Sequence, residues 1–207
     1  MHHSITIDDY LLETVNDTKF LGIIIDEKMK FDKHINHICD KVSRSIGIIY
    51  KIQSLVPRNL LRTIYFTIVH PYFIYCLPIF ASTYATHLNP LIIMQKKAIR
   101  IISGAGYLDH TNSLFYSNKI LKIPDLNKYQ LGCYAYNNPD ILNQHIRTHN
   151  YNTRNRNDLM PTFQRLRVSE QSVIHNTITN WNEIPLNVKA SPSINSFKYH
   201  YNWNKDP

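Results

Sequence analysis

The sequence is poor in glycine, cysteine and acidic residues. Five glycines among 207 residues leave little room for flexible low-complexity linkers. The three cysteines, Cys39, Cys76 and Cys133, are odd in number and widely spaced, which argues against a disulfide framework and favours free thiols in a reducing compartment. The chain is therefore expected to be intracellular, in the nucleus or cytoplasm, and not secreted.

The sequence also lacks the signatures of several chemistries. It has no Cys-x-x-Cys pair, P-loop, Gly-x-Ser-x-Gly elbow or Gly-x-Gly-x-x-Gly turn, which argues against a zinc knuckle, those hydrolases and those nucleotide sites. His34, His37 and Cys39 lie close together, but without a further ligand such a group is typical of a helix surface. The apolar stretch 64–81 contains Pro71 and Pro78, which favours buried helices over a membrane span. No metal, cofactor or membrane partner is expected for this chain.

Basic residues are in excess. Lys and Arg number 23 against 15 Asp and Glu, a formal net charge of +8. Such an excess favours a polyanionic partner, of which nucleic acid is the commonest. The 14 tyrosines add side chains that could stack on bases, although most are expected in the core or at its rim.

The first thirty residues combine strand and turn signals. Residues 5–12 predict a short hairpin, and the apolar run 20–25 predicts a buried strand in which Gly22 allows a close approach. Asp8 and Asp9 are two adjacent carboxylates, the pair that a polymerase uses to hold magnesium ions. Thr6 and Ile7 stand where the aromatic of such a motif would be, so an ordinary turn is favoured over a metal site.

A helix with one apolar and one basic side follows from Phe31. Ile35, Ile38, Val42, Ile46 and Ile49 recur at three- and four-residue steps, and Asp32 is the expected N-cap. The basic side carries Lys33, His37, Lys41, Arg44 and Lys51.

Further helices are predicted over residues 58–81 and 90–103. The first is expected to break at Pro71 and to leave Arg62 on its solvent side. The second presents another basic side, formed by Lys96, Lys97 and Arg100. Residues 145–167 are rich in arginine and predict a basic, loop-rich arm that includes Arg154 and Arg156.

These elements predict a mainly α fold. A short N-terminal β-hairpin precedes a helical bundle and a loop-rich basic C-terminal part with short helices. The expected divisions are 1–30, 31–137 and 138–207.

Several sequence blocks, in a fixed order, resemble the C-terminal half of reverse transcriptases of non-LTR retrotransposons, in the jockey-like and CR1-like branch. Two of them are Lys19-Phe20-Leu21-Gly22-Ile23 and the helix 91–102, which is similar to that family's Gln-Lys-Arg-Ala-Ile-Arg helix. The others are residues 43–51, 55–58, 70–75, 149–154, 181–185 and 196–198. No single block is specific to this family. The order of the blocks, from about residue 18 to residue 198, is what makes the resemblance specific.

The resemblance implies an edge of the polymerase palm followed by its thumb. In such enzymes the Phe-Leu-Gly strand lies near the 3′ end of the primer, which implies a primer-grip-like role for Phe20, Leu21 and Gly22. The alternative for Phe20 and Leu21 is packing in the core. The residues implied to contact the template–primer duplex from the thumb are Lys41, Arg44, Lys51, Arg58 and Arg62. Further expected contacts with nucleic acid are Lys96, Lys97, Arg100, Arg154 and Arg156.

The chain is thus interpreted as part of an RNA-directed DNA polymerase without the catalytic palm, whose remaining role is to bind an RNA/DNA template–primer. The missing palm and fingers portion is a second candidate partner, and the complete enzyme of the family would use Mg²⁺. The alternative is a non-catalytic helical remnant or a protein-interaction domain with no role toward nucleic acid.

Because the three metal-binding aspartates of the palm are not seen in this sequence, we expect the purified chain to show no magnesium-dependent extension of a primer on an RNA template. A primer-extension assay with a complete reverse transcriptase as positive control measures this directly. Extension that requires this chain and magnesium would contradict the interpretation.

Overall fold

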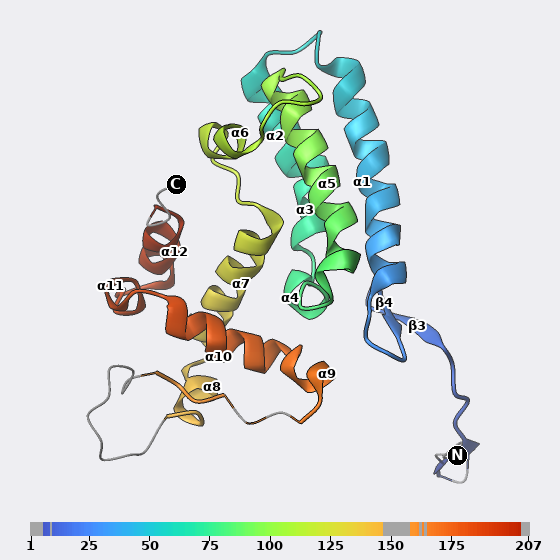
Figure 1. The fold of residues 1–207 in the computed structure, drawn as a ribbon, viewed down its shortest axis with the longest axis vertical. Helices are drawn as coiled ribbons and strands as arrows, with labels where there is room; N and C mark the ends of the chain where they lie inside the picture. The colour runs from blue at the N-terminus through green and yellow to red at the C-terminus, as the bar shows by residue number, and fades with distance from the viewer. Residues whose placement is uncertain (1–5, 9, 147–157, 162, 164, 204–207) are drawn as a thin grey trace.

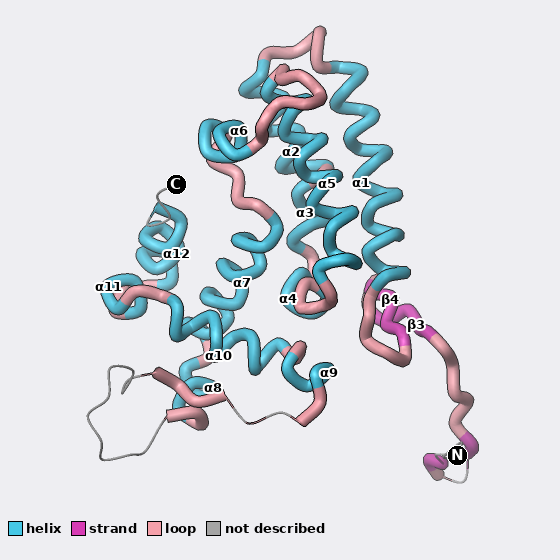
Figure 2. Tube along the Cα trace, in the orientation of Figure 1, coloured by secondary structure: helices cyan, strands magenta, loops and turns pink. Residues whose placement is uncertain are grey.

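The computed structural model describes residues 6–8, 10–146, 158–161, 163 and 165–203. Two antiparallel strand pairs come first: β1 (Thr6–Ile7) with β2 (Tyr10–Leu11), and β3 (Asp17–Phe20) with β4 (Ile23–Asp26). Asp8 lies in the turn between β1 and β2, as the turn interpretation predicted. Helices make up most of the described chain after β4, which confirms the mainly α prediction (Figure 2).

The first helices form a bundle. They are α1 (Asp32–Ile52), α2 (Arg58–Ile68), α3 (His70–Ile74), α4 (Leu77–Phe80) and α5 (Ala85–Ser103). Helices α1 and α5 lie side by side and run in the same direction, away from the β3–β4 hairpin (Figure 1). The stretch predicted as one helix broken at Pro71 is three short helices, because Cys76 also adopts a left-handed conformation with φ of 54°.

The remaining helices form the other side of the molecule (Figure 1). They are α6 (Asn112–Ser117), α7 (Ile123–Asn137), α8 (Pro139–Asn143), α9 (Arg167–Glu170), α10 (Val173–Glu183), α11 (Leu186–Lys189) and α12 (Ile194–Trp203). Described residues after 166 are mostly helical, so the predicted loop-rich character does not extend to this part of the chain.

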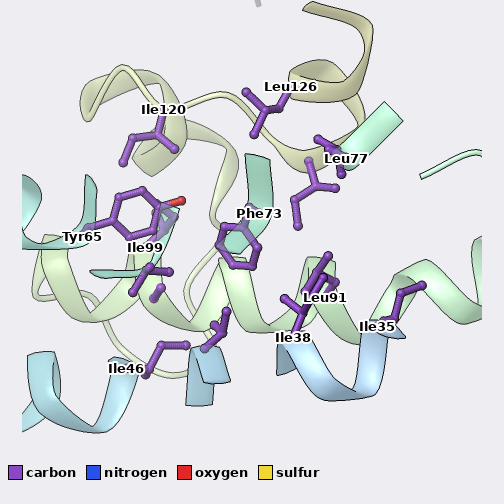
Figure 3. Close-up of a cluster of buried hydrophobic side chains, with 14 of the residues drawn as sticks. Ile35, Ile38, Ile46, Tyr65, Phe73, Leu77, Leu91, Ile99, Ile120 and Leu126 are labelled. Atoms are coloured by element: carbon purple, nitrogen blue, oxygen red, sulfur yellow. The ribbon is translucent and has the colours of Figure 1, made fainter. Parts of the chain in front are cut away.

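The main core confirms the predicted apolar stripe of α1. Ile35, Ile38, Val42, Ile46 and Ile49 are all buried. They pack with fully buried side chains from α2, α3 and α5, among them Tyr65, Phe73, Leu91 and Ile99 (Figure 3). Burial of such side chains is the main favourable term in folding, so the orientation of α1 is fixed by its own apolar face.

A buried amide joins the bundle to α7. Gln95 on α5 is completely buried, and its Nε2 donates to the Leu121 carbonyl at 2.9 Å while its Oε1 accepts from the Ile123 N–H at 3.0 Å. Both ends of the amide are therefore satisfied, as a buried polar group requires. These two bonds fix the chain where it enters α7.

Helix α7 takes part in a second, smaller core. Ile184, Val188, Phe197 and Tyr201 are buried there, and partly buried residues of α7 pack against them. Tyr129 on α7 contacts both cores. The division of the chain at residue 137 stays a prediction.

Two histidines of the bundle are shielded from water. His34 is 3% exposed and its Nδ1 accepts the Ile24 N–H at 3.4 Å, while His70 is half-buried against the rings of Tyr65 and Phe66. Burial lowers the pKa of both histidines below the ordinary value of 6.5, and the nearby His37 lowers the pKa of His34 further. The folded state therefore favours their neutral forms.

We expect the free energy of unfolding to fall as the pH drops below about 6.5. A histidine whose pKa is depressed by folding stabilises the native state above its unfolded pKa and loses this contribution as the pH falls, by at most about 1.4 kcal/mol per pH unit for each histidine. Urea unfolding between pH 7 and 5 should show this slope, and His34→Gln combined with His70→Gln should flatten it. The pair His110→Gln and His200→Gln, at exposed positions, is the control and should leave the slope unchanged.

Candidate nucleic-acid interface

The candidate site begins at the tip of the β3–β4 hairpin. Phe20 pairs with Ile23, and the residues between them, Leu21 and Gly22, have φ angles of 46° and 86°. Two consecutive left-handed residues are typical of the tight turn that joins antiparallel strands. The predicted single buried strand over residues 20–25 is therefore wrong. The chain reverses within the apolar run because Gly22 has no Cβ and tolerates this backbone conformation.

The two apolar residues at the tip face solvent. Phe20 is 62% exposed and Leu21 is 73% exposed, whereas Ile23 is buried. The alternative that Phe20 and Leu21 pack in the core is therefore wrong. Both side chains are accessible to a ligand, and their contact with a primer stays a prediction.

Contacts from the bundle hold the hairpin in place. The Tyr75 hydroxyl donates to the Leu21 carbonyl at 2.6 Å, and the edge of the Tyr75 ring lies 3.6 Å from where a Cβ on Gly22 would be. His34 accepts the Ile24 N–H from the opposite strand. Sequence reasoning missed Tyr75 because 54 residues separate it from its partner, and no local pattern reports such a contact.

Asp26 forms the junction between the hairpin and α1. Its carboxylate accepts the backbone N–H groups of Lys28 and Lys30 at 3.1 Å and of Phe31 at 2.7 Å. Burial raises the pKa of Asp26, but these backbone hydrogen bonds outweigh burial and hold the pKa below its ordinary value. The expected N-cap, Asp32, is wrong: it is the first residue of α1, and no side chain caps this helix at its N-cap position.

Three of the predicted contacts lie on the solvent side of α1. Arg44 and Lys51 are exposed and Lys41 is half-buried, opposite the stripe that packs in the core. Arg44 Nε donates to the Asp40 carbonyl of the same helix at 3.3 Å. None of the three forms an ion pair with any residue that the structure describes. Their positive charges are therefore not neutralised by the described part of the protein.

The two arginines of α2 have structural contacts that the sequence did not predict. A Cβ on Gly104 would lie 2.7 Å from Arg58 Nη2, so the Arg58 guanidinium lies against the C-terminal end of α5. Arg62 is half-buried: its Nε donates to the Asn118 carbonyl at 2.7 Å, and its guanidinium lies 4.9 Å from the centre of the Phe66 ring. Arg62 was expected on the solvent side of its helix, and these contacts leave it only partly exposed there.

The basic residues of α5 also fall into two groups, exposed side chains and one that is held by a hydrogen bond. Lys96 and Lys97 are exposed, and neither forms an ion pair within the described residues. Arg100 is half-buried and its Nε donates to the Asp109 carbonyl at 3.0 Å. Two of the three predicted side chains are thus unengaged, and the third fastens the loop after α5.

The predicted contacts Arg154 and Arg156 lie outside the described residues. The described residues before and after this stretch are joined by a hydrogen bond, in which the Met160 N–H donates to the His145 carbonyl at 2.9 Å. Asn182 on α10 makes two hydrogen bonds of 2.9 Å with the backbone of Leu159. Asn182 belongs to one of the blocks that carried the resemblance, and it acts here as a backbone clamp.

Positive charge is concentrated in one part of the chain. Residues 41–124 contain ten Lys and Arg residues and a single acidic residue, Asp109, whereas the other 123 residues contain 13 basic and 14 acidic residues. This stretch comprises most of α1, all of α2 to α6 and the first two residues of α7. The stretch 41–124 is therefore strongly basic, while the rest of the chain is close to neutral.

The described residues do not fit the paired magnesium ions of a complete polymerase. They include no group of three or more His, Cys, Asp or Glu side chains that could hold a metal ion. Asp8 stands exposed in the β1–β2 turn, and Asp9 lies outside the described residues. Across those same residues, no helix has both the length and the apolar character needed to cross a bilayer.

The fold and the charge together define a mainly helical protein in which a basic helical bundle is preceded by an anchored hairpin. Over about half its length, this chain is similar to RNA-directed DNA polymerases of mobile elements, which confirms the predicted resemblance to non-LTR retrotransposon reverse transcriptases. No family model matches the chain, and no solved structure matches it.

The particular relatives are polymerases of insect elements. The chain is 31% identical over 126 residues to the RNA-directed DNA polymerase from mobile element jockey of Drosophila funebris, and 34% identical over 116 residues to that of Drosophila melanogaster. These matches cover 58% and 52% of this chain but only 14% and 12% of the relatives. A third match, 24% identical, is to the probable RNA-directed DNA polymerase from transposon X-element of Drosophila melanogaster, of which it covers 14%.

Gly22→Ala should lower the free energy of unfolding by about 1 kcal/mol, because an L side chain at a φ of 86° is strained. Gly47→Ala is the matched control: Gly47 lies on the exposed side of α1, and no atom beyond its chain neighbours and the adjacent backbone of its own helix lies within 4 Å of an added Cβ. That change should raise stability by about 0.5 to 1 kcal/mol, as expected for alanine in a helix. Urea unfolding measures both, and stabilisation by Gly22→Ala would contradict the hairpin turn.

Proposed function

We propose that this chain is the thumb-like, nucleic-acid-binding part of a non-LTR retrotransposon reverse transcriptase, and that it holds an RNA/DNA template–primer duplex without catalysing polymerisation. The observation that carries the proposal is the charge of residues 41–124, which contain ten basic residues and one acidic residue. Similarity to RNA-directed DNA polymerases supports nucleic acid as the polyanion.

The helix α1 provides the main surface for phosphates. Its apolar stripe is buried, so Lys41, Arg44 and Lys51 face outward without a described counter-ion. Lys41 and Lys51 are ten residues apart, which is about 15 Å along a helix axis and enough to follow several successive phosphates. Such contacts give affinity and orientation but no base sequence preference. Lys96 and Lys97 add a second exposed pair on the neighbouring α5.

The hairpin tip provides the contact with the end of the primer. Phe20 and Leu21 are exposed, while Tyr75 and His34 hold the backbone of the tip against the bundle. A fixed backbone turn with accessible apolar side chains can pack against a terminal sugar or base. Arg58, Arg62 and Arg100 act mainly by holding the bundle together, since each already contacts a backbone group of a neighbouring element.

The N-terminal strand pairs support a second partner, the palm and fingers portion of the same polymerase. Within the described residues, each pair is a two-stranded sheet, so its outer edges can accept further strands. Ile7, Tyr10 and Leu11 are 58%, 79% and 69% exposed, which is costly unless another protein surface covers them. In the complete polymerase, that portion would supply the carboxylates for Mg²⁺.

The combined variant Lys41→Glu, Arg44→Glu and Lys51→Glu should abolish most of the salt-sensitive binding of a labelled RNA/DNA hybrid duplex. For phosphate-led binding, the logarithm of the association constant falls by about 0.9 per contact for each unit of log salt concentration, so the variant should also show a shallower salt dependence. Fluorescence anisotropy at low and moderate salt measures both quantities.

The matched control is Lys28→Glu, Lys30→Glu and Lys198→Glu, which changes the net charge equally at exposed positions outside the basic stretch. This control should retain most of the binding. Equal losses in both variants would mean that net charge alone governs binding. Binding that ignores salt would favour the alternative, a helical domain with no role toward nucleic acid.

A further inference from the structure

A tight turn follows α5 at the end of the bundle away from the hairpin (Figure 1). The Asp109 N–H donates to the Gly106 carbonyl at 3.2 Å, which closes a four-residue turn with Tyr107 and Leu108 at its two central positions. The Asp109 carboxylate accepts the Gly106 N–H at 2.7 Å and so braces the turn from within.

The turn is fastened firmly to the helix before it. Arg100 Nε donates to the Asp109 carbonyl, and the Ala105 N–H donates to the Arg100 carbonyl at 2.9 Å. Gly104 ends α5 in a left-handed conformation with φ of 65°, and the Arg58 guanidinium lies directly against it. The position of the turn is therefore set by hydrogen bonds to the bundle.

This fixed turn presents two large side chains to solvent. Tyr107 is 81% exposed and Leu108 is 86% exposed, more than any other described large hydrophobic residue except Phe163. A flexible loop could fold such side chains back onto the protein, but a braced turn holds them outward. The arrangement therefore favours contact with a ligand over burial in the chain itself.

The charge around the turn identifies the kind of ligand. Asp109 is the single acidic residue between Lys41 and Pro124, and its carboxylate is engaged by the Gly106 N–H. The last turn of α1, which contains Lys51, and the start of α2 at Arg58 lie at this same end of the bundle (Figure 2). An exposed aromatic ring beside unneutralised positive charge is the arrangement that binds single-stranded nucleic acid, where rings stack on bases and cations contact phosphates.

We propose that the turn Gly106–Asp109 is a stacking site for unpaired bases, with Tyr107 stacking on a base and Leu108 packing beside it. The inference rests on the proposed function and adds to it a contact with a single-stranded segment next to the duplex held by the basic helices. The proposed site gives a ligand to Tyr107 and Leu108, which belong neither to the basic sides of the helices nor to the sequence blocks that resemble the family.

The test compares two probes with the full chain: a blunt RNA/DNA hybrid duplex, and the same duplex with a single-stranded extension that carries a fluorescent base quenched by stacking. The wild-type chain should bind the extended probe on the order of tenfold more tightly and quench its base. Tyr107→Ala should lose the tenfold gain and the quenching but keep the affinity for the blunt duplex. Tyr107→Trp should keep the gain, the quenching and the affinity for the blunt duplex.

Tyr10→Ala is the matched control, because Tyr10 is 79% exposed and lies in β2, outside the helical bundle. It should behave as the wild type, and circular dichroism should show that each variant is folded. An extension gain that survives Tyr107→Ala, or a wild-type chain without such a gain, would overturn the inference while blunt-duplex binding still supports the proposed function. Loss of salt-sensitive binding to both probes would overturn both. A change of oligomeric state in Tyr107→Ala would make the turn a contact between copies and would also overturn the inference.

Discussion

The burial of one face of α1 determines most of the surface properties of this protein. Ile35, Val42 and Ile49 are packed against α5, α2 and α3, and a helix cannot rotate without exposing such a stripe to water. Because the basic side chains of α1 lie opposite this stripe, the same packing that stabilises the bundle holds them in solvent. The charged surface is thus a consequence of the core.

Not all basic residues on this bundle serve the same purpose. Lys41, Lys51, Lys96 and Lys97 are unpaired within the described residues, whereas Arg58, Arg62 and Arg100 each contact the backbone of another element. The planar guanidinium, with several donors in fixed directions, is suited to bind carbonyl groups at helix ends and turns. These three arginines therefore maintain the geometry of the bundle, and the lysines together with Arg44 supply most of its free charge.

The sequence predicted the helical parts of the site correctly, but it did not predict where the chain turns back on itself. The solvent side of α1 follows from the helical period of its apolar residues, which places Ile35, Val42 and Ile49 on one side. The hairpin turn at Leu21 and Gly22 does not follow from a period, because an apolar run without a polar residue has the pattern of a single strand. The sequence likewise predicted Asp32, and not Asp26, as the residue that caps the start of α1. The three backbone N–H groups that Asp26 accepts become its neighbours only when the loop before α1 is formed.

By itself, the sequence determined the mainly α fold, the buried stripe of α1, the excess of positive charge and the resemblance to mobile-element polymerases. These features depend on local periodicity, on composition and on the order of short blocks. Only the tertiary structure decided that Tyr75 holds the hairpin tip, that Gln95 fixes the entry to α7, and that a braced turn presents Tyr107 and Leu108. Each of these depends on hydrogen bonds or exposure that arise when separate elements meet, and no local pattern of residues encodes such a meeting.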